Sequence, residues 1–142
     1  MIRGRQRAQG LFELAMVMPG VLLGLMILLG LGLVLRADGG VAGVAVEAAR
    51  AAALASDASS AAIAARKQAI SVGEGYGLTN GSLELAAVDA SAFRRGGEVR
   101  VVVTYVLPVG NLPLLGWQAI TLRHEAFAPI DPNRTFRSKT AP

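Results

Sequence analysis

The chain has 142 residues, a formal net charge of +4, a mean hydropathy of +0.48 and no cysteine. The absence of cysteine excludes a disulfide framework, a thiolate metal site, a thiol nucleophile and a lipid-modified cysteine anchor. Many of the basic residues lie near the two ends and form no basic face with interleaved aromatic residues, so the composition argues against nucleic-acid binding.

Residues 1–8 form a basic leader with three arginines, Arg3, Arg5 and Arg7, and no acidic residue. Positive charge before a first membrane span favours the cytoplasmic side of the membrane. The sequence therefore predicts a cytoplasmic amino terminus and an extracytoplasmic remainder.

A transmembrane helix is predicted over 9–36, where an uninterrupted apolar run extends from Leu14 to Leu35. The run exceeds the about 20 helical residues that cross a hydrocarbon core of about 30 Å. A core helix of this kind, apolar on every side, would need a large partner surface around it. A secretory signal peptide cut after Gly43-Val44-Ala45 is the alternative, but its apolar region would be shorter, at about 7 to 15 residues.

Two further features of the span bear on how the helix packs and on its shape. Gly20 and Gly24 are four residues apart, and small residues at this spacing let helices approach closely in lipid, although glycine is also common in membrane helices generally. Pro19 lacks a backbone N–H group and predicts a kink near the start of the helix.

The segment from Ala8 to Pro19, AQGLFELAMVMP, resembles the start of TadE-like proteins, minor pseudopilins of the tight-adherence (Flp) branch of type IV pilus assembly. Members of this family show a small residue, a glutamine-led hydrophobic string with glutamate at its fifth position, and a proline six residues later. Here Ala8, Gln9, Glu13 and Pro19 fall in that register, although the family more often has glycine before the glutamine. A weaker match extends over roughly residues 5 to 128.

The resemblance implies that a prepilin peptidase cuts between Ala8 and Gln9, removing the leader on the cytoplasmic face. A cut between Gly10 and Leu11 competes, and would leave Glu13 third instead of fifth. Glu13 would then dock against the freed amino terminus of a neighbouring subunit, because a carboxylate beside an ammonium group is favourable in a low dielectric. The implied partners are other pilin or pseudopilin subunits, the prepilin peptidase, the pilus assembly platform of the inner membrane, and membrane lipid.

An amphipathic helix is predicted over 37–72. The pair Gly39-Gly40 either breaks or only bends the helix at its start. The loop that follows contains a G-x-G-x-G run, but it follows a helix and precedes a strand, which is the reverse of a nucleotide-binding loop. The apolar face of the helix is expected to consist of Val41, Val44, Ala48, Ala52, Ala55, Ile63 and Ile70.

The segment 73–128 is predicted to be a β-rich head with one small antiparallel sheet. Period-2 alternation indicates three strands, Leu83–Val88, Glu98–Leu107 and Ala119–Phe127, with a turn at 94–97 and one apolar face. The apolar connection 108–116 either covers a sheet edge or contacts a partner. Residues 129–142 are expected to be an irregular tail, and the fold class is α+β.

Catalytic patterns are lacking in the sequence. His124 is the only histidine, the acidic residues form no matched pair, and no serine lies in a nucleophile elbow, so we expect no enzyme activity, no metal site and no cofactor. The predicted function is that of a pilus assembly component that docks through its amino-terminal helix, with roles in adhesion or secretion. The alternative is a single-pass, membrane-anchored extracytoplasmic binding module whose span is only an anchor.

Overall fold

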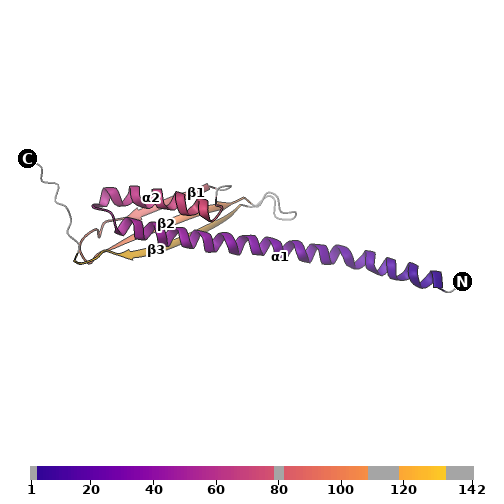
Figure 1. The fold of residues 1–142 in the computed structure, drawn as a ribbon. Coiled ribbons are helices and arrows are strands. Elements are labelled where there is room, and N and C mark those ends of the chain that lie inside the picture. The colour runs from indigo at the N-terminus through magenta and orange to yellow at the C-terminus, as the bar shows by residue number, and fades with distance from the viewer. Residues whose placement is uncertain (1–2, 79–81, 109–118, 134–142) are drawn as a thin grey trace, which may run out of the picture. The chain divides into compact units, whose positions relative to one another are not determined.

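The structure is a computed structural model that describes residues 3–78, 82–108 and 119–133. The chain divides into two compact units, Met1–Leu35 and Arg36–Pro142, and we call the second unit the head. The predicted α+β class is confirmed: a long amino-terminal helix is followed by a second helix and a small antiparallel sheet (Figure 1). The elements are α1 (Arg3–Ala53), α2 (Ala58–Gly75), β1 (Ser82–Asp89), β2 (Glu98–Leu107) and β3 (Ile120–Pro129).

The sheet has the order β1-β2-β3, with both neighbouring pairs antiparallel. The three predicted strands are confirmed to within two residues at each end. Alternation along β2 also predicted the apolar face correctly, since Val99, Val101, Val103 and Tyr105 are all buried. One face of the central strand therefore lies in the core, as expected for a sheet with one covered face.

A β-bulge in β1 shifts its register between Leu85 and Ala87. Leu83 pairs with Tyr105 and Leu85 with Val103 before the bulge, whereas Val88 pairs with Val101 after it. One extra residue reverses the alternation, so Val88 shares the apolar face with Leu83 and Leu85 despite the odd spacing.

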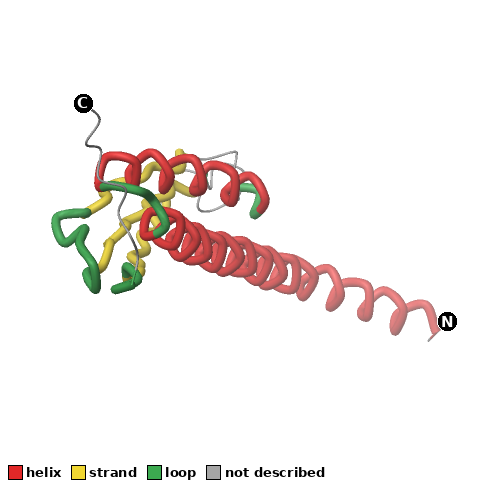
Figure 2. Tube along the Cα trace, turned by 60° about the vertical axis from the view of Figure 1, so that its left-hand side comes forward, coloured by secondary structure: helices red, strands yellow, loops and turns green. Residues whose placement is uncertain are grey.

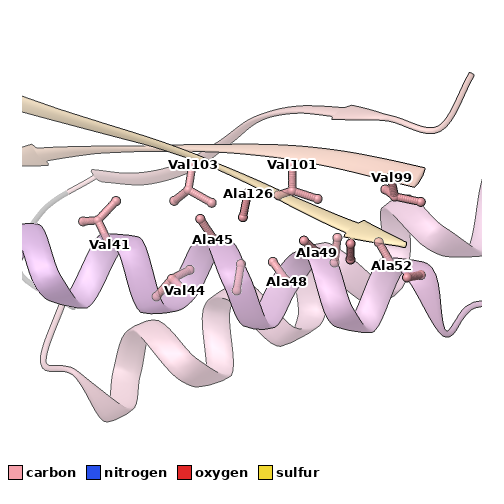
Figure 3. Close-up of a cluster of buried hydrophobic side chains, with 14 of the residues drawn as sticks. Val41, Val44, Ala45, Ala48, Ala49, Ala52, Val99, Val101, Val103 and Ala126 are labelled. Carbon is pink, nitrogen blue, oxygen red and sulfur yellow. The ribbon is translucent and has the colours of Figure 1, made fainter. Parts of the chain in front are cut away.

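Helix α1 continues through Gly39 and Gly40, so these glycines do not break it. Beyond them the predicted apolar face is confirmed as far as Ala52: Val41, Val44, Ala48 and Ala52 are each fully buried. Figure 3 shows Val41 and Ala45 of this helix directed at the valines of β2. The apolar side chains of α1 and β2 therefore meet across the centre of the head.

The helical region breaks instead at 54–57, and the prediction of one helix through this point is wrong. Asp57 is the N-cap of α2: its carboxylate accepts a hydrogen bond from the Ser60 backbone N–H at 2.8 Å, and the Ser60 hydroxyl completes a capping box. Hydrogen bonds from the Ser59 hydroxyl, the Ser60 N–H and the Ser56 hydroxyl hold the pKa of Asp57 well below its usual value. The cap lets a new helix start with a different phase.

The change of phase overturns the predicted face of the second half. Ile63 and Ile70 were expected to be buried, but they are 71% and 52% exposed. The buried residues of α2 are instead small and four apart: Ala61, Ala65, Ala69 and Gly73. Figure 2 shows α2 running beside the end of α1, with both helices on the same face of the sheet.

Regular structure continues slightly beyond residue 128, where the β-rich segment was predicted to end. Strand β3 extends to Pro129, and Ile130 is 1% exposed and donates its N–H to the Gly97 carbonyl oxygen at 2.8 Å. The predicted turn at 94–97 is present, with Gly96 at φ 70°. Most of the predicted tail and most of the connection 108–116 lie outside the described residues.

Candidate functional site

The amino-terminal block lies on the first part of α1, where large apolar side chains are exposed. Phe12 is 65% exposed and Leu14 is 56% exposed, and Glu13 lies between them as an exposed carboxylate. A charged residue at the edge of an apolar segment costs less than one at its centre. Glu13 is thus the single acidic residue of an otherwise apolar helical surface from Phe12 to Leu35.

Both candidate cleavage sites fall within α1, because the helix includes Ala8, Gln9, Gly10 and Leu11. Gly10 is exposed, and a methyl group on its backbone would meet no neighbouring atom. The choice between the two sites stays a prediction.

The predicted packing glycines have open surroundings. A methyl group at Gly20 or Gly24 would meet nothing within 4 Å, so this surface of α1 is available for close approach by another helix. The helix also runs through Pro19 without ending there. The predicted kink at that residue stays a prediction.

Among the described residues, one helix is long and apolar enough to cross a membrane, and it lies near the amino terminus, within Phe12–Ala53. Only 6% of its most apolar stretch is buried inside the protein. A core helix of the chain's own head would be mostly buried. The apolar surface of α1 therefore requires a lipid or protein environment outside this chain.

The core of the head bears directly on the signal-peptide alternative. Cleavage after Gly43-Val44-Ala45 would remove Val41 and Val44, which are both 0% exposed and rank among the largest fully buried side chains. It would also remove Asp38, which contacts β3. A mature protein that began at Val46 would lack part of its own core, so the geometry disfavours this cut.

A glycine notch in α1, formed by Gly40 and Gly43, receives the ring of Tyr76. A methyl group on Gly43 would lie 2.9 Å from the Tyr76 hydroxyl oxygen, and one on Gly40 would lie 3.3 Å from the Tyr76 Cβ. Any larger residue at Gly43 would push the ring away from the helix. Sequence reasoning considered Gly40 as a helix breaker, whereas its role is to make room.

Tyr76 is held in place by a Schellman motif at the end of α2. The Leu78 N–H donates to the Gly73 carbonyl oxygen at 2.9 Å, and the Gly77 N–H donates to the Glu74 carbonyl oxygen at 3.0 Å. Gly77 has φ 74°, which favours glycine. Two glycines of the G-x-G-x-G run, Gly73 and Gly77, therefore serve a helix end, in agreement with the rejection of a phosphate loop.

A second contact joins α1 to the sheet near the notch. His124 Nε2 lies 2.7 Å from Asp38 Oδ1, and both side chains are partly exposed. His124 falls between the buried Leu122 and Ala126 in the alternation along β3, and its partner on α1 could not be named from the sequence. The pair fixes the start of the head's helix against the sheet.

The outer face of the sheet is of mixed polarity, and most of its side chains are at least partly exposed, although Val102 is only 4% exposed. Arg100 Nη2 donates to Glu125 Oε2 at 2.6 Å, and its guanidinium lies 5.7 Å from the centre of the Phe127 ring. The hydrogen bond from Arg100 to the Glu125 carboxylate raises the arginine pKa. These cross-strand contacts suit a solvated sheet face and bring together no catalytic groups.

The described part of the chain has scattered metal-ligating side chains and a small hollow. No group of three or more histidine, aspartate or glutamate side chains lies close enough to hold a metal ion in residues 3–78, 82–108 and 119–133. A small hollow of about 240 Å³ between α2 and β1 is lined by Arg66, Ala69, Ile70 and Leu83 to Leu85. It holds only one basic and one acidic side chain.

Comparison with known proteins adds no assignment: no family model, curated protein or solved structure matches this chain. The resemblance to TadE-like pseudopilins therefore rests on the residues from Ala8 to Pro19 and stays a prediction.

Proposed function

We propose that this protein is a minor pseudopilin-like component of a tight-adherence pilus assembly system, anchored in the inner membrane by α1. Its amino terminus lies in the cytoplasm, its head lies outside, and it docks with other pilin subunits through its amino-terminal helix. The peptidase that removes the leader and the assembly platform in the membrane are its further partners. The proposed role is docking rather than catalysis.

The observation that carries the proposal is the position of Glu13 on an exposed apolar helix surface, five residues into the sequence that begins at Gln9. An anchor requires only an apolar helix, so the binding-module alternative gives no reason for a carboxylate at this place. The open surroundings of Gly20 and Gly24 also favour a helix that packs against other helices.

The mature protein is expected to begin at Gln9 and to depend on a prepilin peptidase. The amino-terminal sequence of protein purified from membranes, with and without an active peptidase in the host, measures both expectations. A start at Leu11 would keep the proposed class but move the cut to Gly10. A start at Val46 would establish an ordinary signal peptide and contradict the proposal.

The predicted topology places Pro142 outside the cytoplasm, because the three leader arginines hold the amino terminus inside. A reporter that is active only in the cytoplasm should therefore be silent when it is fused after Pro142. The same reporter fused before Met1 is the matched control and should be active. Cytoplasmic activity of the carboxyl-terminal fusion would reject the proposed topology.

A further inference from the structure

Tyr76 packs in the glycine notch with only part of its surface. Its ring lies against Gly40 and Gly43, yet the residue remains 49% exposed. The Schellman motif around Gly77 holds the backbone on both sides of it. One edge of a firmly held tyrosine is thus presented outward from this end of the head.

The chain itself limits how far this ring can be from the membrane. The apolar run ends at Leu35, and Gly40 follows it by five residues. Five residues of helix rise about 8 Å, and even a fully extended chain of that length would reach only about 17 Å. The polar layer on each side of a bilayer is about 5 to 8 Å thick. A ring between Gly40 and Gly43, about 8 to 12 Å beyond the run along the helix, therefore lies just outside that layer.

Tyrosine suits that depth. Tyrosine and tryptophan are enriched where membranes meet water, because the ring is apolar and the hydroxyl can remain hydrated. The charged residues close in sequence to Gly40 or to Tyr76 are Arg36, Asp38 and Glu74, and together they carry no excess of positive charge. Asp38 already contacts His124. Attraction to anionic lipid is therefore not the source of binding, and the charge of the lipid should matter little.

We propose that Tyr76, held in the notch of Gly40 and Gly43, is an interfacial anchor that rests this end of the head on the headgroup layer of the membrane that α1 crosses. The inference rests on the proposed membrane span. It adds a second lipid contact, made by a residue that is 41 positions away from the end of the apolar run in the sequence. The anchor would limit tilting of the head over the membrane surface.

The test places a single tryptophan at three positions of the full chain, in a background where the only natural tryptophan is replaced by Trp117→Phe. Tyr76→Trp reports the proposed anchor. Ile63→Trp is the matched control, because Ile63 is 71% exposed on α2 and about 20 Å along the helix axis from Tyr76, which follows its end. Leu25→Trp reports the span. Each variant is reconstituted into phosphatidylcholine vesicles that carry spin labels either in the headgroup or near the end of the acyl chain.

The expected result is a loss of fluorescence at position 76 with the headgroup label, a much smaller loss at position 63, and a loss at position 25 with the deep label. Equal behaviour of positions 76 and 63, with position 25 quenched by the deep label, would overturn the anchor while leaving the span intact. No quenching at position 25 by the deep label would overturn the span and the anchor together.

A second variant guards against disturbance of the notch by the larger tryptophan ring. Gly75→Cys leaves Tyr76 in place, and a side chain at Gly75 would meet no atom within 4 Å. Since the chain has no cysteine, a nitrobenzoxadiazole dye attached there is the only label, with Ile63→Cys as its control. Quenching of the dye by headgroup spin labels at position 75 and not at position 63 supports the anchor, and equal quenching at both overturns it.

Discussion

Glu13→Gln is expected to abolish assembly with other pilus subunits while leaving insertion into the membrane unchanged. The substitution keeps the size and hydrogen-bonding capacity of the side chain but removes its charge. If Glu13 neutralises the freed amino terminus of a neighbour, the variant leaves that ammonium group in the membrane interface without its counter-charge. Breaking such a pair costs about 3 kcal/mol or more, which corresponds to about a 100-fold loss in association.

Insertion should survive because the variant makes the helix less polar at the edge of the apolar segment. The measurement is co-purification of Glu13→Gln with other pilin subunits, together with a count of surface fibres, in cells whose membranes contain the variant at the parental level. Matched levels matter because a poorly inserted protein would also fail to assemble.

Glu47→Gln is the matched control. Glu47 lies on the same helix but in the head, where its carboxylate accepts a hydrogen bond from Arg50 Nη1 at 2.9 Å on an exposed surface. An exposed pair of this kind contributes at most about 1 kcal/mol, so its loss should leave assembly unchanged. Normal association and fibre number in Glu13→Gln would contradict the docking role and favour the simple anchor.

The strands of the head could be predicted from the sequence because their signal is local. Alternation along Glu98–Leu107 requires knowledge of no other segment, and the buried face of β2 follows it. The long apolar part of α1 is predictable for the same reason. The position of Glu13 relative to Gln9 is also a purely local observation, which is why the candidate site could be defined at all.

The break between the helices was missed because two local signals competed. Gly39-Gly40 is the more conspicuous pair, but helix propensity is a weak guide when tertiary packing decides, and here Tyr76 fills the space that Gly40 and Gly43 leave. The true break carries its own signal, the capping pattern of Asp57 followed by Ser60.

The remaining contacts depend on residues far apart in the chain. Asp38 and His124 are separated by 86 positions, and no periodicity within α1 or β3 shows that they meet. The bulge in β1 likewise depends on the register with β2, since the Leu83, Leu85 and Val88 spacing has no meaning without the partner strand. Such features require the assembled fold.

Ala65→Leu is expected to destabilise the head, because α2 packs into the core through small side chains. Ala65 is 0% exposed and belongs to the buried row Ala61, Ala65, Ala69 and Gly73 of α2. On α1 the buried residues are also mostly alanine, including Ala45, Ala48 and Ala52. Small residues let α2 lie close to the rest of the core, so the interior has no room for a larger side chain.

The added atoms of leucine must separate α2 from its neighbours or force a strained rotamer, at a cost of about 1 to 3 kcal/mol. For a domain of this size the melting temperature should fall by roughly 5 to 15 °C. Ala62→Leu is the matched control. Ala62 is exposed on the same helix, three residues before Ala65, so the same substitution there should leave the melting temperature nearly unchanged.

The measurement is thermal unfolding of the full chain in detergent micelles, followed by near-ultraviolet circular dichroism, to which the buried ring of Tyr105 contributes. Loss of that signal reports the head, because α1 outside the head contributes no tyrosine or tryptophan. Equal melting of Ala65→Leu and the parent would show that the core is not closely packed around Ala65. A fall of equal size in Ala62→Leu would show that the effect belongs to leucine in this helix and not to the alanine contact.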